Sequence, residues 1–329
     1  MGFDAFFFAR LDYADKERRM NELEMEYIWR PNPLSLGNQT QIFTHVLYAH
    51  YSSPSGFNFD ILDGDDPWIN NAQSEDFNAA KEAKKMAGEI EERLQHYLTD
   101  DLFMVFGDDF RYMNAFQNYH NMDGMISYMN EHYGDKYLFK YSTPSDYIDA
   151  LQKYQVQWPT KYDDMFPYSD SPDAYWTGYF SSRANDKAFT RKGSSVFHAQ
   201  SQLLSEAVLD ANKSKEQIGQ ILEAKEDFLD AMGINQHHDA ITGTAKQRVA
   251  DDYAFRISRA IKSSSDLYSS LIENKINLLS GLASDQKWVQ CERTNSTFLD
   301  CPISEFSHEL QNGFQMTVVV HNPSSLDLQ

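Results

Sequence analysis

In the first half of the chain, short apolar segments alternate with helical patterns, and polar residues directly follow the apolar segments. Phe3 to Ala9 is an almost continuous apolar run, typical of a strand buried on both faces. Leu102–Phe106 and Tyr137–Tyr141 are two further apolar strands by this criterion. The segments with helical spacing are Tyr13–Ile28 and Asn78–Leu98. This alternation predicts a parallel α/β barrel or a doubly wound sheet up to about residue 155.

Helical patterns dominate the rest of the chain. A loop rich in Asp, Pro and Tyr covers residues 156–175, and a helical segment runs from Val196 to Met232. The next helix carries an apolar residue every fourth position, at Val249, Tyr253, Ile257 and Ile261. A β segment begins near residue 287 and includes a strand over Met316–His321. We therefore expect a barrel-like half, a helical bundle and the start of a β-rich region.

Charge and apolar content exclude several classes of protein. The 329 residues include 49 acidic and 29 basic side chains, and the net charge of −20 repels nucleic acid. No apolar run reaches the roughly 18 residues of a membrane span. The chain opens inside a strand and shows no signal peptide, so we expect an internal fragment of a longer protein. The sequence does not indicate an oligomeric state.

Two cysteines and three glycosylation sequons favour the secretory route. Cys291 and Cys301 stand close together, as a local disulfide or as two free thiols. The sequons begin at Asn38, Asn212 and Asn295.

A pair of aspartates is the first candidate for catalysis. Gly107, Asp108 and Asp109 follow an apolar strand, which is where α/β barrels place catalytic side chains. A carboxyl beside a second negative charge and away from water acts as a general acid. The alternative is a solvated turn, because Gly and Asp are also common turn residues.

Two further groups are candidates for binding. His237, His238 and Asp239 offer a metal ligand with an adjacent carboxylate, or simply a polar loop. Aromatic residues beside acids in loops are typical of sugar-binding clefts, although core packing accounts for them equally well. These aromatics are Tyr51, Trp68, Tyr168, Tyr175, Trp176 and Tyr179.

Several longer strings carry a family resemblance. They are GFDAFFFARLDYADK, GDDFRY, YSTPSDY, DDMFPYSDSPDAYWTGYFSSR and QHHDAITGTAKQRVADDY. With these strings the chain resembles the α-mannosidases of glycoside hydrolase family 38, most of all the lysosomal-type branch. The resemblance implies an α/β parallel barrel portion (incomplete), a helical bundle and the start of a β-sandwich region. It places the end of the catalytic barrel at residues 1–155, a connecting loop and middle domain at 156–285, and the β-rich region at 286–329.

The family also implies a retaining, zinc-dependent exo-α-mannosidase that releases mannose from N-glycans in the lysosome or secretory pathway. Asp109 matches the general acid/base, and His238 matches a zinc ligand. The remaining matches are substrate-binding residues: Arg10, Tyr51, Asp108, Trp176 and Asp239.

The chain departs from the family at two motifs. The family's His-x-Asp zinc pair and its I-D-P-F-G-H-S type segment with the nucleophile both precede the strand that opens this chain, and the only His-x-Asp spacing in residues 1–329, at His237 and Asp239, belongs to the QHHDAITGT string. We therefore expect the other zinc ligands upstream of residue 1 and expect this chain alone to be inactive. Two alternatives stay open: a non-catalytic glycan-binding relic of an α-mannosidase, and a purely structural helical module.

Overall fold

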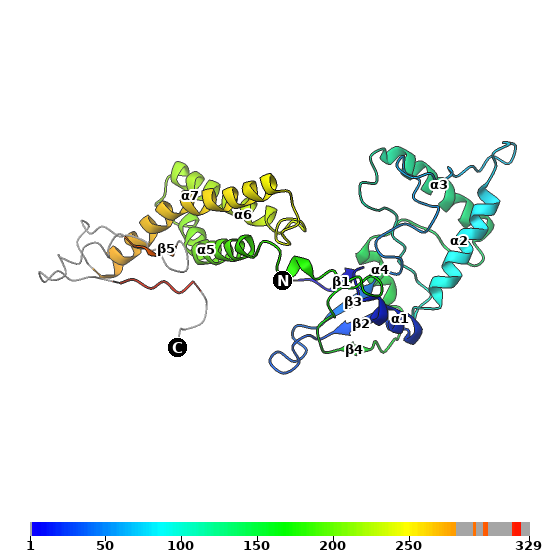
Figure 1. Ribbon diagram of the computed structural model, residues 1–329, viewed down its shortest axis with the longest axis horizontal. Helices are drawn as coiled ribbons and strands as arrows, with labels where there is room; N and C mark the ends of the chain where they lie inside the picture. Colours follow the sequence, from blue (N-terminus) through cyan, green and yellow to red (C-terminus); the bar gives the residue numbers. More distant parts are fainter. Residues whose placement is uncertain (1, 281–291, 294–298, 302–317, 324–329) are drawn as a thin grey trace, which may run out of the picture. The chain divides into compact units, whose positions relative to one another are not determined.

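The computed structural model describes residues 2–280, 292–293, 299–301 and 318–323 (Figure 1). It divides into two compact units, Met1–Thr177 and Gly178–Gln329, and each is described by itself. The sequence boundary at residue 155 stays a prediction. Most of residues 286–329, including Cys291 and part of the strand expected at Met316–His321, lies outside the described residues.

A small mixed sheet organises the first unit. Its strands are β1 (Ala5–Phe8), β2 (Glu26–Trp29), β3 (Ile42–Val46) and β4 (Thr160–Lys161), in the spatial order β1-β3-β2-β4. β1 pairs with β3 and β2 pairs with β4 in parallel, whereas β2 and β3 are antiparallel. The antiparallel pair departs from the parallel sheet that the sequence predicts: a loop of 12 residues, 30–41, returns the chain so that two consecutive strands lie side by side.

The helix expected over Tyr13–Ile28 is shorter than predicted. α1 covers Tyr13–Glu22, and Leu23 ends it in the left-handed conformation (φ 59°), with its N–H bonded to the carbonyl of Arg19. The chain then enters β2 directly. At its start, the Asp12 carboxylate accepts hydrogen bonds from the N–H groups of Ala14 and Asp15, as an N-cap does.

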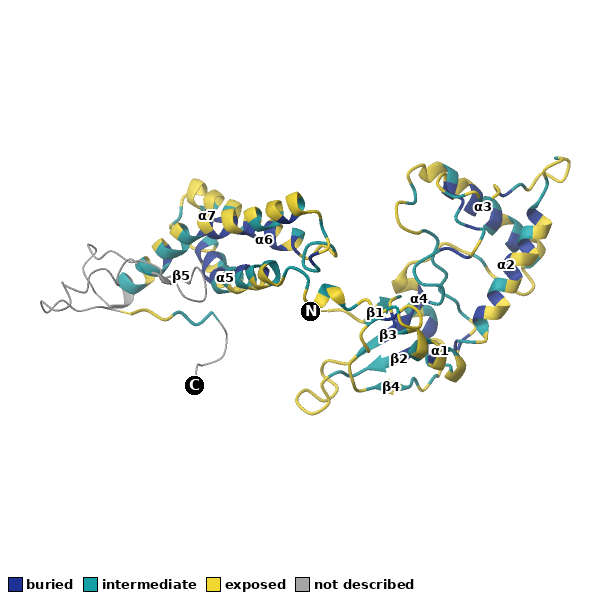
Figure 2. Cartoon of the chain, viewed as in Figure 1, coloured by how far each residue is buried: buried dark blue, intermediate teal, exposed yellow. Residues whose placement is uncertain are grey.

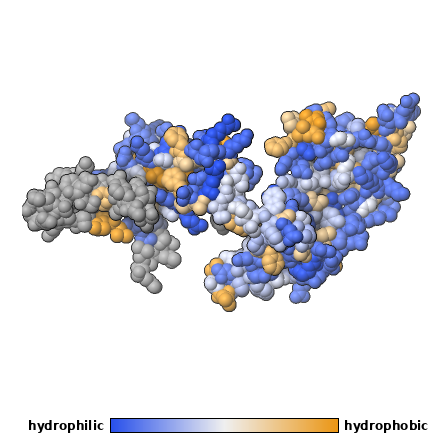
Figure 3. Space-filling model, viewed as in Figure 1, coloured by the Kyte–Doolittle hydropathy of each residue, from blue (hydrophilic) through white to orange (hydrophobic). Residues whose placement is uncertain are grey.

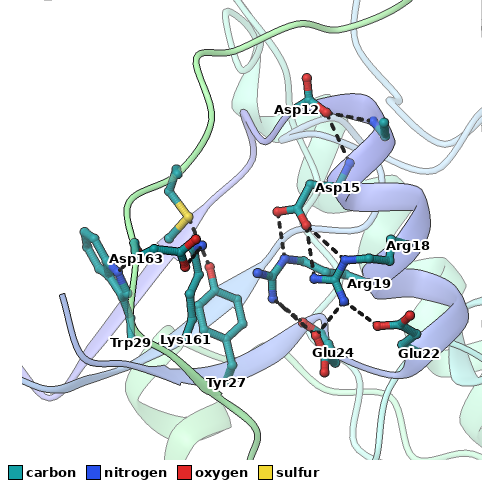
Figure 4. A network of polar contacts seen from close by, with 12 residues as sticks. Asp12, Asp15, Arg18, Arg19, Glu22, Glu24, Tyr27, Trp29, Lys161 and Asp163 are labelled. Carbon is teal, nitrogen blue, oxygen red and sulfur yellow. Dashed lines mark hydrogen bonds and ion pairs between the residues drawn. The ribbon is translucent and has the colours of Figure 1, made fainter. Parts of the chain in front are cut away.

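Buried charge ties α1 to this sheet (Figure 4). The Arg19 side chain is only 4% exposed, pairs with Asp15 at 3.0 Å, and lies 4.4 Å above the ring of buried Tyr27 on β2. At the end of β2, the indole N–H of Trp29 donates to the carbonyl of Asp163 just after β4. These contacts hold residues 26–28, the end of the predicted helix, in a strand.

Two predicted strands are extended segments without a strand partner among the described residues. Leu102–Phe106 and Tyr137–Tyr141 instead pack side chains on the core between α2 (Ala79–Leu94) and α3 (Ala115–His132). The Asn130 side chain bonds both the N–H and the carbonyl of Phe139, at 2.8 and 2.9 Å. A side chain thus satisfies backbone groups that a neighbouring strand would otherwise take. α4 (Pro144–Leu151) follows, with a capping box at Thr143.

Three long helices form the second unit. After a short 3₁₀ turn (η1, Gly178–Phe180) come α5 (Ala184–Val208), α6 (Lys215–Ile234) and α7 (Gln247–Ser280). The single helix expected over Val196–Met232 is therefore two helices, because Ser214 caps the start of α6.

The core of this unit lies where the three helices face one another (Figure 2). Gly193 on α5 leaves no room for a side chain, because a Cβ there would lie 2.8 Å from Ile257 of α7. Ile257 and Ile261, on the stripe predicted from the sequence, are buried against Phe228 of α6. Two short strands, β5 (Glu292–Arg293) and β6 (Leu299–Asp300), pair antiparallel further along.

Hydrophilic side chains cover most of the visible face of each unit (Figure 3), in keeping with the net charge of −20. No described helix is both long enough and apolar enough to span a membrane.

Candidate active site

The segment after β3 and the Gly107–Asp109 loop pair residue by residue in opposite directions. Ser53 bonds both backbone groups of Gly107: its N–H donates to the carbonyl at 2.9 Å, and its hydroxyl accepts from the N–H at 2.7 Å. The Ser52 hydroxyl bonds the Asp108 carboxylate, and the Tyr51 hydroxyl donates to Asp109 Oδ1 at 3.2 Å. The structure thus brings half-buried Tyr51 together with the exposed Asp108 and Asp109.

The two aspartates have different surroundings. The hydrogen bonds from Ser52 and from the N–H of Asp109 lower the pKa of the Asp108 carboxyl, and nearby Arg111 and His50 act in the same direction. Asp108 is therefore ionised over the whole physiological range. Asp109, the next residue, lies beside this negative charge, and its carboxylate accepts the hydrogen bond from the Tyr51 hydroxyl.

Arg10 and Trp176 form a second contact in the same unit. The Arg10 guanidinium lies 4.8 Å from the centre of the Trp176 ring and 5.9 Å from that of Tyr168. The two rings are 5.6 Å apart, and the N–H of Trp176 donates to the carbonyl of Tyr168. Trp176 keeps 42% of its surface exposed, so the ring remains available to a ligand.

Sequence reasoning missed His50. Its ring lies 4.0 Å from that of Tyr51, and burial followed by the charges of Arg10 and Lys16 lowers its pKa, although Asp108 and Asp109 oppose the change. The charged groups that act on His50 therefore include Arg10, which contacts Trp176, and the two aspartates Asp108 and Asp109. No spacing rule identifies such a residue; only its position next to Tyr51 could have drawn attention to it.

The histidine pair lies in the second unit, in the loop between α6 and α7. Ligand atoms of His237, His238 and Asp239 all lie within 4.8 Å of one another. Asp239 Oδ1 accepts the Thr244 hydroxyl at 2.7 Å, and this bond, followed by the two histidines, lowers the pKa of Asp239. His238 is 85% exposed. Two imidazoles and an oriented, ionised carboxylate are a donor set that suits a divalent transition metal such as zinc.

The start of α5 holds this loop in place. The Arg183 side chain donates to the carbonyls of Gly243 and Ala245, at 3.3 and 2.9 Å, and to the Gln247 side chain at 2.6 Å. One turn later, Lys187 donates to the carbonyl of Ile241 at 2.6 Å. The strings YWTGYFSSR and QHHDAITGT therefore meet through hydrogen bonds, although about 60 residues separate them.

Gly243 makes this close approach possible. Its φ of +76° lies in the left-handed region, and a Cβ would stand 2.5 Å from the carbonyl oxygen of Ser182. The Ser182 hydroxyl donates to the carbonyl of Gly243 at 3.0 Å.

Comparisons with known proteins give the family. Residues 1–171 match the glycosyl hydrolases family 38 N-terminal domain, and residues 174–274 match the alpha mannosidase middle domain. The chain belongs to glycosyl hydrolase family 38. This confirms the resemblance that the sequence strings indicate.

Curated relatives and solved structures agree with this assignment. The chain is 41% identical over 262 residues to a lysosomal alpha-mannosidase of Dictyostelium discoideum, covering 78% of this chain and 25% of that protein. It is 34% identical over 325 residues to the lysosomal alpha-mannosidase of Homo sapiens, covering 98% and 30%. A crystal structure of an alpha-mannosidase from Enterococcus faecalis V583 shares the fold, with TM-score 0.55, 18% identity, and coverage of 83% and 27%. The chain thus spans less than a third of each of these proteins.

Proposed function

We propose that the full-length protein is a retaining, zinc-dependent exo-α-mannosidase that releases mannose from N-glycans in the lysosome or secretory pathway. The observation that carries this proposal is the Asp108–Asp109 pair, held by Tyr51, Ser52 and Ser53 at the end of an apolar segment. We also propose that the mixed sheet belongs to an incomplete α/β barrel and that residues 286–329 begin a β-sandwich region.

Asp109 is the general acid/base in this proposal. In a retaining glycosidase one carboxyl protonates the leaving oxygen while a second, about 5 Å away, attacks the anomeric carbon. Asp109 gives its proton to the leaving oxygen and then takes one from the incoming water. We expect the nucleophile to come from a part of the protein outside these 329 residues.

Arg10, Tyr51 and Trp176 bind the sugar. The exposed face of Trp176 packs on the apolar face of a pyranose, while Arg10, held above that ring, donates to hydroxyl groups. Tyr51 and Asp108 offer further polar atoms beside Asp109.

His238 is the zinc ligand of this chain in the proposal, and Asp239, whose carboxylate accepts a hydrogen bond from Thr244, is its sugar-binding neighbour. When bound, zinc would orient those hydroxyls and stabilise developing charge. The remaining ligands are expected outside this chain.

The test uses an aryl α-mannoside and the longest natural form of the protein. We expect turnover that falls about 10²- to 10⁴-fold on Asp109→Asn, the range for a lost general acid/base. Asp66→Asn, which removes an exposed acid of the same unit, is the matched control and leaves turnover unchanged. Glycan binding without any turnover would contradict the proposal and support the relic instead.

The 329-residue chain alone should neither turn over the mannoside nor bind zinc tightly. Stoichiometric zinc in that chain, together with turnover that Asp109→Asn abolishes, would contradict this expectation.

A further inference from the structure

A buried carboxylate lies behind the Asp108–Asp109 loop. Asp60, in the segment between β3 and α2, is 3% exposed. Its carboxylate accepts the N–H of Tyr112 at 2.7 Å, the N–H of Leu62 at 3.1 Å and the side-chain amide of Asn118 at 3.3 Å. Burial by itself would raise the pKa of Asp60, but these three hydrogen bonds and nearby Arg111 outweigh it and lower the pKa. The buried group is therefore an ionised carboxylate surrounded by donors.

The backbone that Asp60 holds is in an unfavourable conformation. Phe110 and Tyr112 have φ angles of 60° and 63°, in the left-handed region that side chains other than glycine disfavour. Such a conformation persists only where the surroundings enforce it. Between the two, Arg111 donates to the carbonyl of Asp109 at 2.9 Å and forms an ion pair with Asp63 at 2.7 Å. Asp60 and Asp63 thus fix residues 111 and 112 from one segment.

Asp109 therefore lies between two fixed points. Ser52 and Ser53 hold residues 107 and 108 on one side, and Asp60 and Asp63 hold residues 111 and 112 on the other. If Asp60 released Tyr112, the two left-handed residues could relax toward ordinary φ values. The peptide on either side of Phe110 would rotate, and the Asp109 carboxylate would leave the Tyr51 hydroxyl.

We infer that Asp60, assisted by Asp63, is a positioning residue that enforces the left-handed backbone at Phe110 and Tyr112 and so directs Asp109 at the reacting oxygen. The catalytic consequence rests on the proposed function, whereas the conformational one does not. Two measurements separate them.

The first measurement is amide hydrogen exchange in the 329-residue chain. Asp60→Asn keeps the shape of the side chain but replaces one acceptor oxygen by an amide N–H group, which faces the N–H donors that the carboxylate accepts. We expect the amides of residues 109–112 to exchange about tenfold faster, as for the loss of one bond to a charged acceptor, with α2 unchanged. Asp66→Asn removes an exposed charge six residues away and should alter neither region. Unchanged exchange at 109–112 in Asp60→Asn would overturn the inference.

A milder variant serves if Asp60→Asn does not fold. Asp63→Asn removes the ion pair with Arg111 at a side chain that is 19% exposed. Faster exchange is again expected at 109–112, to a smaller extent. Exchange equal to that of Asp66→Asn would count against the inference.

The second measurement compares mannosides with good and poor leaving groups in the longest natural form. For a poor leaving group, which needs a proton from Asp109, we expect Asp60→Asn to lower kcat/KM by about 10²-fold, the cost of a misplacement near 1 Å. A dinitrophenyl leaving group needs no proton, so its kcat/KM should hardly change. Equal losses for both substrates would indicate general damage and refute the positioning role. If the unaltered protein cleaves no mannoside, the proposed function fails, and hydrogen exchange still decides the inference.

Discussion

Arg183→Ala tests how the loop that carries His238 and Asp239 is held. The half-buried guanidinium makes three hydrogen bonds, to the carbonyls of Gly243 and Ala245 and to the exposed Gln247 side chain. A hydrogen bond to a charged group contributes about 1.5–3 kcal/mol. The bond to Ala245 is counted in full, while the 3.3 Å bond to Gly243 and the exposed one to Gln247 count for less. We therefore expect the free energy of unfolding of the second unit to fall by about 2–4 kcal/mol.

Thermal unfolding followed by circular dichroism measures this loss. In a unit of this size, 1 kcal/mol shifts the midpoint by about 2–4 °C, so a shift of about 4–16 °C is expected. Arg191→Ala is the matched control, because Arg191 lies two turns later on α5 and is exposed. Arg183→Lys keeps the charge but loses the planar fork, so it should fall between the two. Equal midpoints for Arg183→Ala and Arg191→Ala would refute this account of the loop.

Three further predictions concern single groups. Gly243→Ala places a Cβ 2.5 Å from a backbone oxygen at positive φ, so we expect destabilisation of at least about 2 kcal/mol in urea unfolding; a neutral result would exclude the close approach. The pKa of Asp60 in the folded state lies below its ordinary value of 3.8. The contribution of Asp60 to stability is therefore complete above pH 3.8 and is lost as the pH falls through the lowered, folded-state pKa. The urea midpoint should therefore fall more steeply below pH 4 in the unaltered chain than in Asp60→Asn, and parallel pH curves would exclude the effect. His238→Ala should lower the bound zinc of the longest natural form at least about tenfold, while His198→Ala on α5 should not; equal zinc contents would remove His238 from the ligand set.

The sequence predicted correctly those helices whose formation depends on the spacing of their own apolar side chains. α2 and α7 form where the apolar spacing places them, and the Ile257–Ile261 stripe is buried as expected. The Asp108–Asp109 candidate could be found because an apolar run ends in Gly and Asp. Its neighbour Tyr51 could be found as one of several aromatic residues in loops, but no spacing in the sequence links it to Asp109, which lies 58 residues later.

Tertiary contacts decided the rest. The end of α1 has no sequence signal, because Leu23 rather than glycine takes the left-handed position. Leu102–Phe106 reads as a strand from its apolar content, but content does not show which backbone partner is present. Asp60 reads as an ordinary loop acid, and only the Tyr112 N–H, 52 residues later, shows why it is buried.

The reversed pairing of residues 51–53 with 107–109 limits how the chain length can vary during evolution. Each of the three residues bonds a particular partner, so one inserted or deleted residue between Tyr51 and Ser53 would shift the tyrosine hydroxyl from Asp109 to its neighbour. In the exposed loop between β2 and β3, the hydrogen bonds described for residues 32–40 stay within the loop itself, so they set no register with another segment. Natural length variants of this protein should therefore accumulate in residues 32–40 and be absent from residues 51–53.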